Sequence, residues 1–230
     1  GASGIGLAIV ESFLTEGAEI ATCDVDQASL NALAQKYPNI HTYLCDVSDS
    51  GTIQGVIHSA AAQMGGLDCL VNNAGIVRDA RMVNMSNDAF DAVIDVNLKG
   101  TFNFSKMVFP QMMIQKSGVV LNASSIVGIY GNFGQTNYAA SKFGVIGMAK
   151  TWAKEFGKFG IRSNCVCPGM IDTEILKDIP ERVLEDIVSN IPMGRLGDVS
   201  EVASTYSFLA SDEAAYINGA IIEVGGGATL

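Results

Sequence analysis

Positive charge is scarce in this chain, and charge of either sign is low. The 230 residues include 14 Lys and Arg against 24 Asp and Glu, so the formal net charge is −10 at pH 7. Nucleic acids and anionic membrane surfaces attract basic proteins, and we therefore expect neither as a partner. The chain also lacks any apolar run of the roughly 18–20 residues that would span a bilayer. Its hydrophobic share of 48% predicts instead one globular domain over residues 1–230, with a substantial core.

Histidine is almost absent, and the cysteines show no metal-binding spacing. His41 and His58 stand alone in the sequence, so we expect no metal site. The number of cysteines is odd and no CxxC motif occurs, which favours buried, reduced thiols in a cytoplasmic protein. These cysteines are Cys23, Cys45, Cys69, Cys165 and Cys167.

Short apolar runs alternate with helical patterns along the whole chain. Apolar strands joined by helices form parallel sheets that are covered on both faces. The pattern therefore predicts a doubly wound, Rossmann-like α/β fold in three layers, with ligands at the carboxyl ends of the strands. We expect strands at residues 19–23, 41–44, 69–71, 119–121, 161–166 and 221–224, and helices at residues 5–16, 28–36, 52–64, 88–115, 138–159 and 199–209.

Residues 170–192 fit neither pattern. The stretch contains Pro180 and several acidic side chains, and we expect it to be a mobile lid over the substrate. Apolar residues within it could cover an acyl chain: Ile175, Leu176, Ile179 and Leu184.

The chain opens on a glycine-rich turn that runs into a helical pattern. Backbone amides of such a turn face a pyrophosphate group, although a glycine pair before a helix is also common without a ligand. The turn should follow a strand that is central in this architecture. We therefore expect that strand to precede Gly1, and its absence, a truncation at the N-terminus, to leave a gap in the sheet. The residues of the turn are Gly1, Ala2, Ser3, Gly4, Ile5 and Gly6.

Asp24 ends the next expected strand, 20 residues after Gly4. A carboxylate there accepts hydrogen bonds from both adenosine-ribose hydroxyls of NAD and repels the 2′-phosphate of NADP. No Arg or Lys occurs before Lys36, so no nearby cation would neutralise such a phosphate. Asp46 and Val47 end the following strand, where the aspartate either meets the adenine amino group or forms an Asx turn.

Ser125 and Tyr138, thirteen residues apart, carry the strongest chemical signal. Ser125 follows an apolar strand, and Tyr138 opens a helix that holds Lys142 on the same face one turn later. A lysine cation lowers the pKa of a nearby phenol and gives a proton-transfer group usable near pH 7. A serine hydroxyl across the cleft could hold the oxygen of a carbonyl or alcohol. Taken alone, however, a Tyr-x-x-x-Lys motif is more often a surface helix turn.

Asparagines mark two further positions. Asn72, Asn73, Ala74 and Gly75 follow an expected strand, and small residues there suit either close approach to a cofactor or a rigid turn. Asn97 interrupts the helical pattern around it, where a helix-surface asparagine is the alternative.

In their order and intervals these motifs resemble the short-chain dehydrogenase/reductase family over essentially the whole chain. The motifs are Gly-x-x-Gly-Ile-Gly, Asn-Asn-Ala-Gly, Asn97, Ser125, Tyr138-x-x-x-Lys142 and Pro168-Gly169. The first glycine of the family's fingerprint, and the Thr before it, would fall before residue 1.

The resemblance implies a role for each matched residue. Tyr138 would be the acid/base and Ser125 the partner of the substrate oxygen. Lys142 would bind the nicotinamide ribose and lower the tyrosine pKa, and Asn97 would hold a water that links Lys142 to solvent. Further cofactor contacts would come from Asn73, Ala74 and Gly75 near the adenosine-proximal ribose, and from Pro168, Gly169, Ile171 and Thr173 near the carboxamide.

Within the family, residues 131–138, 191–197 and 216–219 look like those of β-ketoacyl-[acyl carrier protein] reductases. We therefore expect a 3-oxoacyl-thioester reductase of fatty acid metabolism that uses NAD. The alternatives are a dehydrogenase of a small sugar, diol or steroid alcohol, and a cofactor-binding scaffold without turnover. The family also implies a homotetramer, with the helices of Asn97 and Tyr138 at one interface. An acidic carrier protein would need a basic surface. Lys116, Lys150, Lys154 and Lys158 would supply it, unless they form only a solvated helix face.

Overall fold

The computed structural model describes residues 1–174, 176 and 181–229, and it has the expected parallel α/β architecture. Every pair of hydrogen-bonded strands among the described residues is parallel, so within each hydrogen-bonded group the carboxyl ends lie along one edge. The strands are β1 Ala21–Asp24, β2 His41–Leu44, β3 Cys69–Asn72, β4 Gly118–Ala123, β5 Ile161–Pro168 and β6 Ile221–Val224.

The sheet is interrupted between β1 and β3. β1 pairs only with β2, and the order β3-β4-β5-β6 forms a separate hydrogen-bonded group. A cavity of about 390 Å³ lies between the two groups, lined on one side by Ile20–Cys23 and on the other by Cys69–Asn73. The cavity lies beside the glycine-rich turn, because Gly1 and Gly6 also line it.

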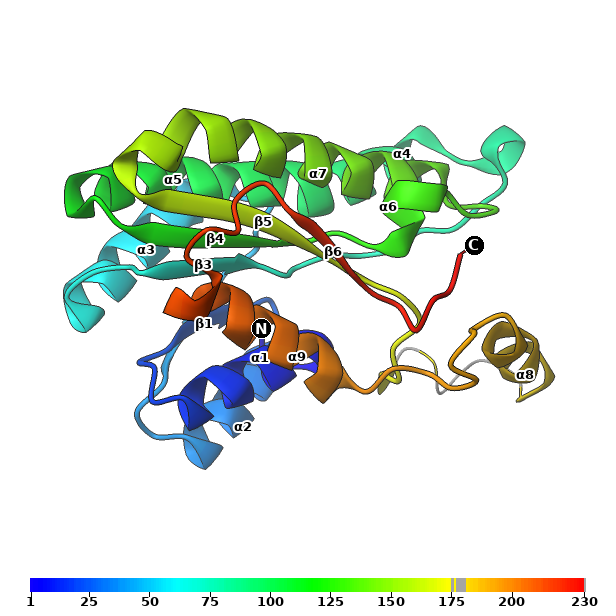
Figure 1. The fold of residues 1–230 in the computed structure, drawn as a ribbon, viewed down its shortest axis with the longest axis horizontal. Helices are drawn as coiled ribbons and strands as arrows, with labels where there is room; N and C mark the ends of the chain where they lie inside the picture. Colours follow the sequence, from blue (N-terminus) through cyan, green and yellow to red (C-terminus); the bar gives the residue numbers. More distant parts are fainter. Residues whose placement is uncertain (175, 177–180, 230) are drawn as a thin grey trace.

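Helices cover both faces of the sheet (Figure 1). On one face α1 (Gly4–Thr15) packs along α9 (Val199–Ala210), with α2 (Gln27–Lys36) beside β1. On the other face lie α3 (Ser50–Met64), α5 (Gly100–Gln115) and α7 (Thr136–Phe156). The doubly wound, three-layered arrangement is therefore confirmed.

The apolar stripes of the helices account for this packing. Ile9 of α1 and Tyr206 and Leu209 of α9 are buried against Leu121 and Val166 of the sheet. On the opposite face, Val108 and Met112 of α5 and Trp152 of α7 cover Val120 and Ile161. Alternate residues of β4 thus point into different cores, as its position inside the sheet requires.

Side-chain caps fix where several helices begin. The Asp26 carboxylate accepts hydrogen bonds from the amides of Ala28 and Ser29 and starts α2. Asp198 and Glu201 form a reciprocal capping box at the start of α9. The turn before β5 needs a glycine, because Gly160 has a φ of +75° and a Cβ there would lie 2.5 Å from the Lys116 carbonyl oxygen.

The helical stretch expected at residues 88–115 is confirmed, and it consists of α4 (Asn87–Val93), a π-helical segment Ile94–Lys99 and α5. A short helix, α6 (Ile126–Tyr130), follows β4 and was not predicted. Within the expected lid, residues Glu181–Ser189 form the helix α8, whose Ile187 packs against the buried cluster of Ile126, Ile191 and Ala228. Ile175 and Ile179 lie outside the described residues.

No described helix combines the length and apolar character needed to cross a membrane. The five cysteines are free thiols.

Candidate active site

Ser125 and Tyr138 meet at the carboxyl end of β4. Ser125 caps α6, accepting a hydrogen bond from the Val127 amide at 3.1 Å, and Tyr138 lies in the first turn of α7. The two helices touch closely, since a Cβ on Gly128 would come within 2.8 Å of the Lys142 Cβ. This contact brings the Ser125 hydroxyl into hydrogen-bonding reach of the Tyr138 phenol.

The pKa of Tyr138 is raised above its ordinary value, contrary to the prediction from the Tyr-x-x-x-Lys motif. Burial of the phenol is the largest cause, the hydrogen bond with Ser125 opposes it, and the negative charge of Asp79 adds to the rise. Lys142 is not among the groups that shift this pKa in the structure, so a lowering by the lysine stays a prediction. A protonated phenol at neutral pH suits Tyr138 as a proton donor.

Lys142 is buried next to the tyrosine ring. Its side chain is 3% exposed, and Nζ donates to the Ala123 carbonyl oxygen at 2.9 Å and lies 5.6 Å from the centre of the Tyr138 ring. Burial lowers the pKa of Lys142 to about 8. The ammonium group is therefore held over the end of β4, on the same side as the phenol.

Asn97 lies in the π-helical segment and is fully buried. Its side-chain amide forms a pair of hydrogen bonds with the backbone of Ile76, at 2.8 and 3.0 Å, and donates to the Ser141 hydroxyl at 3.2 Å. A Cβ on Gly75 would lie 3.4 Å from the Asn97 Oδ1 and 3.3 Å from the Lys142 Nζ. The structure thus brings Gly75, Asn97 and Lys142 together, and the interruption seen in the sequence is a real change of helix type. The water link to Lys142 stays a prediction.

Sequence reasoning missed the residues that anchor the start of α7. Asn137 is fully buried, and its side-chain amide donates to the carbonyl oxygens of Arg78 and Ala89, at 2.9 and 3.2 Å. Gln135 donates to both carboxylate oxygens of Asp79. The signal was available, because Asn137 and Ser141 are polar residues on the same helix face as the buried Val145.

The glycine-rich turn and the end of β3 form a cradle. Ser3 precedes α1 without a side-chain cap, so the first-turn amides have no side-chain acceptor in the part described. A Cβ on Gly6 would lie 2.8 Å from the Asn73 Nδ2 and 3.1 Å from the Gly1 Cα. Free amides at the start of a helix and backbones that exclude a Cβ fit the pyrophosphate of a dinucleotide.

Asp24 lies beside this cradle. Its Oδ2 accepts hydrogen bonds from the Gly1 backbone nitrogen at 2.8 Å and the Ala2 amide at 3.0 Å, and its Oδ1 accepts one from the Asp26 amide at 3.1 Å. Partial burial raises the pKa of Asp24, but these hydrogen bonds outweigh burial and the net pKa is about 2. Asp24 is therefore ionised at neutral pH, as a partner of ribose hydroxyls must be.

Asp46 forms the Asx turn that was its alternative assignment. Its Oδ1 accepts hydrogen bonds from the Ser48 amide at 2.8 Å and the Ser48 hydroxyl at 2.7 Å. Val47 packs against α5, where a Cβ on Gly100 would lie 2.7 Å from its Cγ2. A contact of Asp46 with adenine stays a prediction.

The remaining expected cofactor residues follow β5. Gly169 donates its amide to the Val224 carbonyl oxygen, and a Cβ there would lie 2.7 Å from the Gly225 Cα, so packing alone requires this glycine. Ile171 is buried and bridges to Gly197. Pro168 ends β5, next to the end of β4 that leads to Ser125, and Thr173 lies farther along the same segment.

No group of three or more His, Cys, Asp or Glu side chains that could hold a metal occurs in the described part of the chain.

Comparison with known proteins agrees with this arrangement. The family described as Enoyl-(Acyl carrier protein) reductase matches residues 1–229. The chain belongs to the short-chain dehydrogenase/reductase family. Membership makes the protein an oxidoreductase that uses a nicotinamide cofactor, and the cradle at Gly1–Gly6 fits such a cofactor.

Several relatives are similar over nearly their full length. A 3-oxoacyl-[acyl-carrier-protein] reductase FabG of Thermotoga maritima is 48% identical, with 100% of this chain and 95% of that protein covered. An enzyme of the same name from Staphylococcus aureus is 40% identical, with 97% and 93% covered. An uncharacterized oxidoreductase of Mycobacterium bovis is 42% identical, with 99% and 93% covered. Among short-chain dehydrogenases/reductases, the chain is thus similar to 3-oxoacyl-[acyl-carrier-protein] reductases.

Proposed function

We propose that the protein reduces 3-oxoacyl thioesters, carried by an acyl carrier protein, with NADH as the hydride donor. The observation that carries the proposal is the convergence of Ser125, Tyr138 and Lys142 at the carboxyl end of β4. The printed activity of the relative that is 48% identical supports the substrate class.

Each residue has a distinct task in this proposal. When bound, the nicotinamide supplies the hydride for the carbonyl carbon. Ser125 holds the carbonyl oxygen, and Tyr138, whose raised pKa keeps it protonated, donates its phenolic proton to that oxygen. Lys142 stabilises the resulting phenolate, since a buried ammonium close to the ring attracts negative charge in a medium of low dielectric constant.

The cofactor preference follows from the charge at the end of β1. Asp24 is ionised and faces the cradle, where it would accept hydrogen bonds from ribose hydroxyls and repel a 2′-phosphate. We therefore propose NAD over NADP.

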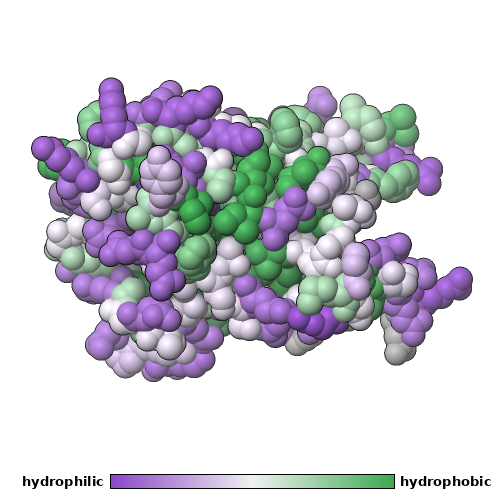
Figure 2. Space-filling view, in the orientation of Figure 1, coloured by the Kyte–Doolittle hydropathy of each residue, from purple (hydrophilic) through white to green (hydrophobic). Residues whose placement is uncertain are grey.

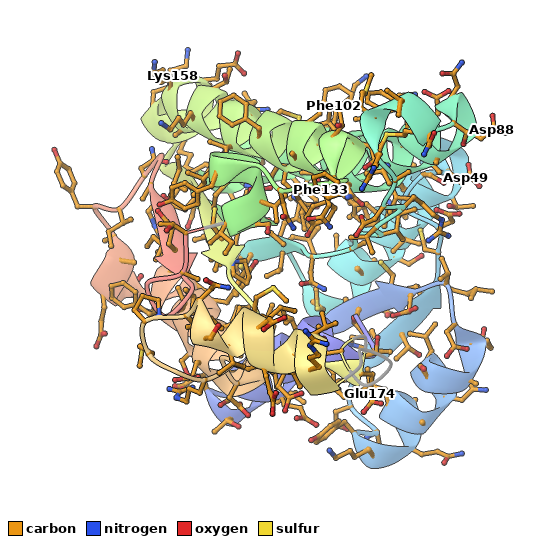
Figure 3. The ribbon with its side chains drawn as sticks, turned by 90° about the vertical axis from the view of Figure 1, so that its right-hand side faces the viewer. Asp49, Asp88, Phe102, Phe133, Lys158 and Glu174 are labelled. Carbon is orange, nitrogen blue, oxygen red and sulfur yellow. The ribbon has the colours of Figure 1, made fainter. Side chains whose placement is uncertain are left out.

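An exposed aromatic side chain is compatible with an acyl substrate. Phe133 is 77% exposed and projects from the loop between α6 and α7, near the centre of the view in Figure 3. The Arg81 guanidinium lies 5.3 Å from the centre of its ring, which joins this loop to the segment after β3. An exposed aromatic ring five residues before Tyr138 offers apolar contact area that an acyl chain could use.

The lysines suited to a carrier protein lie far from the protein's own Tyr138. Lys154 follows Tyr138 by 16 residues of α7, or about 24 Å along the helix axis. A carrier bound to Lys150, Lys154, Lys158 and Lys116 would therefore serve the site of a neighbouring subunit, provided that α7 packs antiparallel on its copy.

Apolar residues also gather across the middle of the face in Figure 2, over the half-buried edge strand β6. Both features fit the proposed homotetramer.

The test is a comparison of substrates with the purified protein. NADH oxidation is followed with acetoacetyl-CoA and with acetoacetyl carrier protein, and NAD reduction with a diol, a sugar and a steroid alcohol. We expect the highest kcat/KM with the carrier-bound substrate, and Lys154→Glu should raise KM for that substrate but not for acetoacetyl-CoA. Faster turnover of a sugar, diol or steroid would favour the alternative dehydrogenases. NADH binding without any turnover would favour a scaffold.

A further inference from the structure

Two segments that are far apart in the sequence contact each other residue by residue next to Tyr138. Residues 78–81 follow β3, and residues 133–137 lead into the first turn of α7. The contacts run in reverse order along the two segments, and we call them the loop clamp. Its four pairs are Arg78 with Asn137, Asp79 with Gln135, Ala80 with Gly134 and Arg81 with Phe133.

The pair of Asp79 and Gln135 joins two side chains in this clamp. The Gln135 Nε2 donates to both Asp79 carboxylate oxygens, at 3.1 and 3.0 Å, and its Oε1 accepts a hydrogen bond from the Asn132 Nδ2 at 2.9 Å. Gln135 directly precedes α7, but its side chain does not cap the helix. Both ends of its amide group are thus used to hold the loop before Tyr138.

The cations nearest to Asp79 in the sequence make other contacts. Arg78 donates to the Val77 carbonyl oxygen at 2.9 Å, and the Arg81 guanidinium lies 5.3 Å from the centre of the Phe133 ring. Since Gln135 is neutral, its hydrogen bonds leave the Asp79 carboxylate with its full negative charge.

This charge acts on the Tyr138 phenol. Burial is the largest cause of the raised pKa of Tyr138, and the charge of Asp79 adds to the rise. Groups on other elements also face the phenol: Cys167 of β5 raises the same pKa, the hydrogen bond with Ser125 lowers it, and the Lys142 Nζ lies 5.6 Å from the ring centre. Asp79 is therefore one of several groups that set the proton affinity of Tyr138.

We propose that Asp79 and Gln135 are positioning residues for Tyr138, because their pair fixes the start of α7 and keeps a carboxylate near the phenol. The inference rests on the proposed function, in which Tyr138 donates a proton to the carbonyl oxygen. Proton transfer needs donor and acceptor at hydrogen-bond distance, and a small displacement of a reacting group lowers the rate steeply. The nearby negative charge also favours the protonated phenol, which is the form that donates.

An exchange of the two side-chain types tests the pair. Gln135→Glu places two carboxylates face to face and removes the donor. Adding Asp79→Asn to this variant restores an amide and a carboxylate with their positions exchanged, and we call this double variant the exchanged pair. Gln63→Glu is the matched control, since it makes the same substitution at an exposed glutamine of α3 whose partner is the Tyr43 hydroxyl.

The first measurement needs no substrate. The Ala80 amide donates to the Gly134 carbonyl oxygen at 2.9 Å, and its hydrogen exchange, followed by NMR, reports on the loop clamp. We expect Gln135→Glu to speed this exchange about five- to tenfold, as repulsion between two partly screened carboxylates predicts. The exchanged pair should return to about the wild-type rate, and Gln63→Glu should not differ from it.

The second measurement is kcat for acetoacetyl-CoA with NADH over a range of pH. Gln135→Glu should lower kcat about five- to tenfold while the Kd for NADH and the melting temperature change little. In the wild type kcat should fall as rising pH removes the donated proton. Asp79→Asn removes a charge that disfavours the phenolate, so this fall should move to lower pH. The exchanged pair keeps a charge at residue 135 and should fall near the wild-type pH, and a purely structural pair would move neither profile.

Three results decide between the proposals. If Gln135→Glu leaves Ala80 exchange and kcat within about twofold of the wild type, the pair does not position Tyr138 and the proposed function stands. An exchanged pair that behaves no better than Gln135→Glu would also overturn the inference, because the two residues would then act separately. If the wild type reduces no 3-oxoacyl thioester, the proposed function fails, and the exchange of Ala80 alone decides whether the pair holds the start of α7.

Discussion

The buried charge of Lys142 should lower the free energy of unfolding, and the variant Lys142→Met tests this. Lys142 is 3% exposed, and burial lowers the pKa of its ammonium group from 10.5 to about 8. At about 1.4 kcal/mol per pKa unit, holding the charge inside opposes folding by up to about 3 kcal/mol below pH 8. Loss of the hydrogen bond to the Ala123 carbonyl oxygen offsets about 1 kcal/mol of that. We therefore expect the methionine variant to be about 1–2 kcal/mol more stable at pH 7.

The sign of the pH dependence follows from the two pKa values. Between about pH 8 and pH 10.5 the unfolded chain holds a proton on Lys142 that the folded chain has released, so wild-type stability gains from rising pH. Other groups titrate in this range, and the difference between wild type and variant isolates the lysine. The difference in free energy of unfolding between the variant and the wild type should therefore shrink as the pH rises from about 8 to about 10.5.

Urea unfolding, followed by Trp152 fluorescence at several pH values, measures this difference in stability. Lys154→Met is the control at an exposed lysine. The reasoning would be refuted if the Lys142→Met protein were less stable than the wild type at pH 7 and the difference in their stability did not change with pH.

Three further outcomes are expected. Tyr138→Phe should lower kcat by at least about 10³-fold while the Kd for NADH changes little. A variant that retains more than a tenth of the wild-type rate in stopped-flow measurements would contradict the acid/base role. Steady-state kinetics should give an NAD preference of roughly 10²-fold in kcat/KM, which Asp24→Ala reduces mainly by raising KM for NAD; a wild type that prefers NADP would exclude this role. In hydrogen exchange, α8 should exchange faster than β4 and slow down when cofactor and substrate bind, and equal rates unaffected by ligands would end the lid hypothesis.

The strands were predictable because apolar runs and their turn residues are local signals. β2 and β6 begin and end as expected, and β1 is shifted by only a residue or two. The five-residue α6 gave no such signal, since it contains less than two turns and a glycine. α8 was hidden by the acidic residues around it, although its apolar residues recur at helical spacing.

At the site, residue identity was predictable but side-chain state was not. The spacing of Ser125, Tyr138 and Lys142 predicted their meeting, which the structure shows. The direction in which the Tyr138 pKa shifts depends on how deeply the phenol is buried and on which acceptor the lysine binds. The spacing of the residues predicts neither. Asp46 shows the same limit, because its position after a strand did not decide between a ligand contact and the turn that its Oδ1 forms with Ser48.

The proposed site is assembled from residues that lie far apart in the sequence. Asp24 ends β1, whereas Gly75 and Ser125 follow β3 and β4. A dinucleotide that contacts all three would link these segments, and its binding would stabilise each of them against local opening. A ligand that reaches only Asp24, such as 5′-AMP, would protect only the backbone near β1 from exchange, while NADH would also protect the segments that follow β3 and β4.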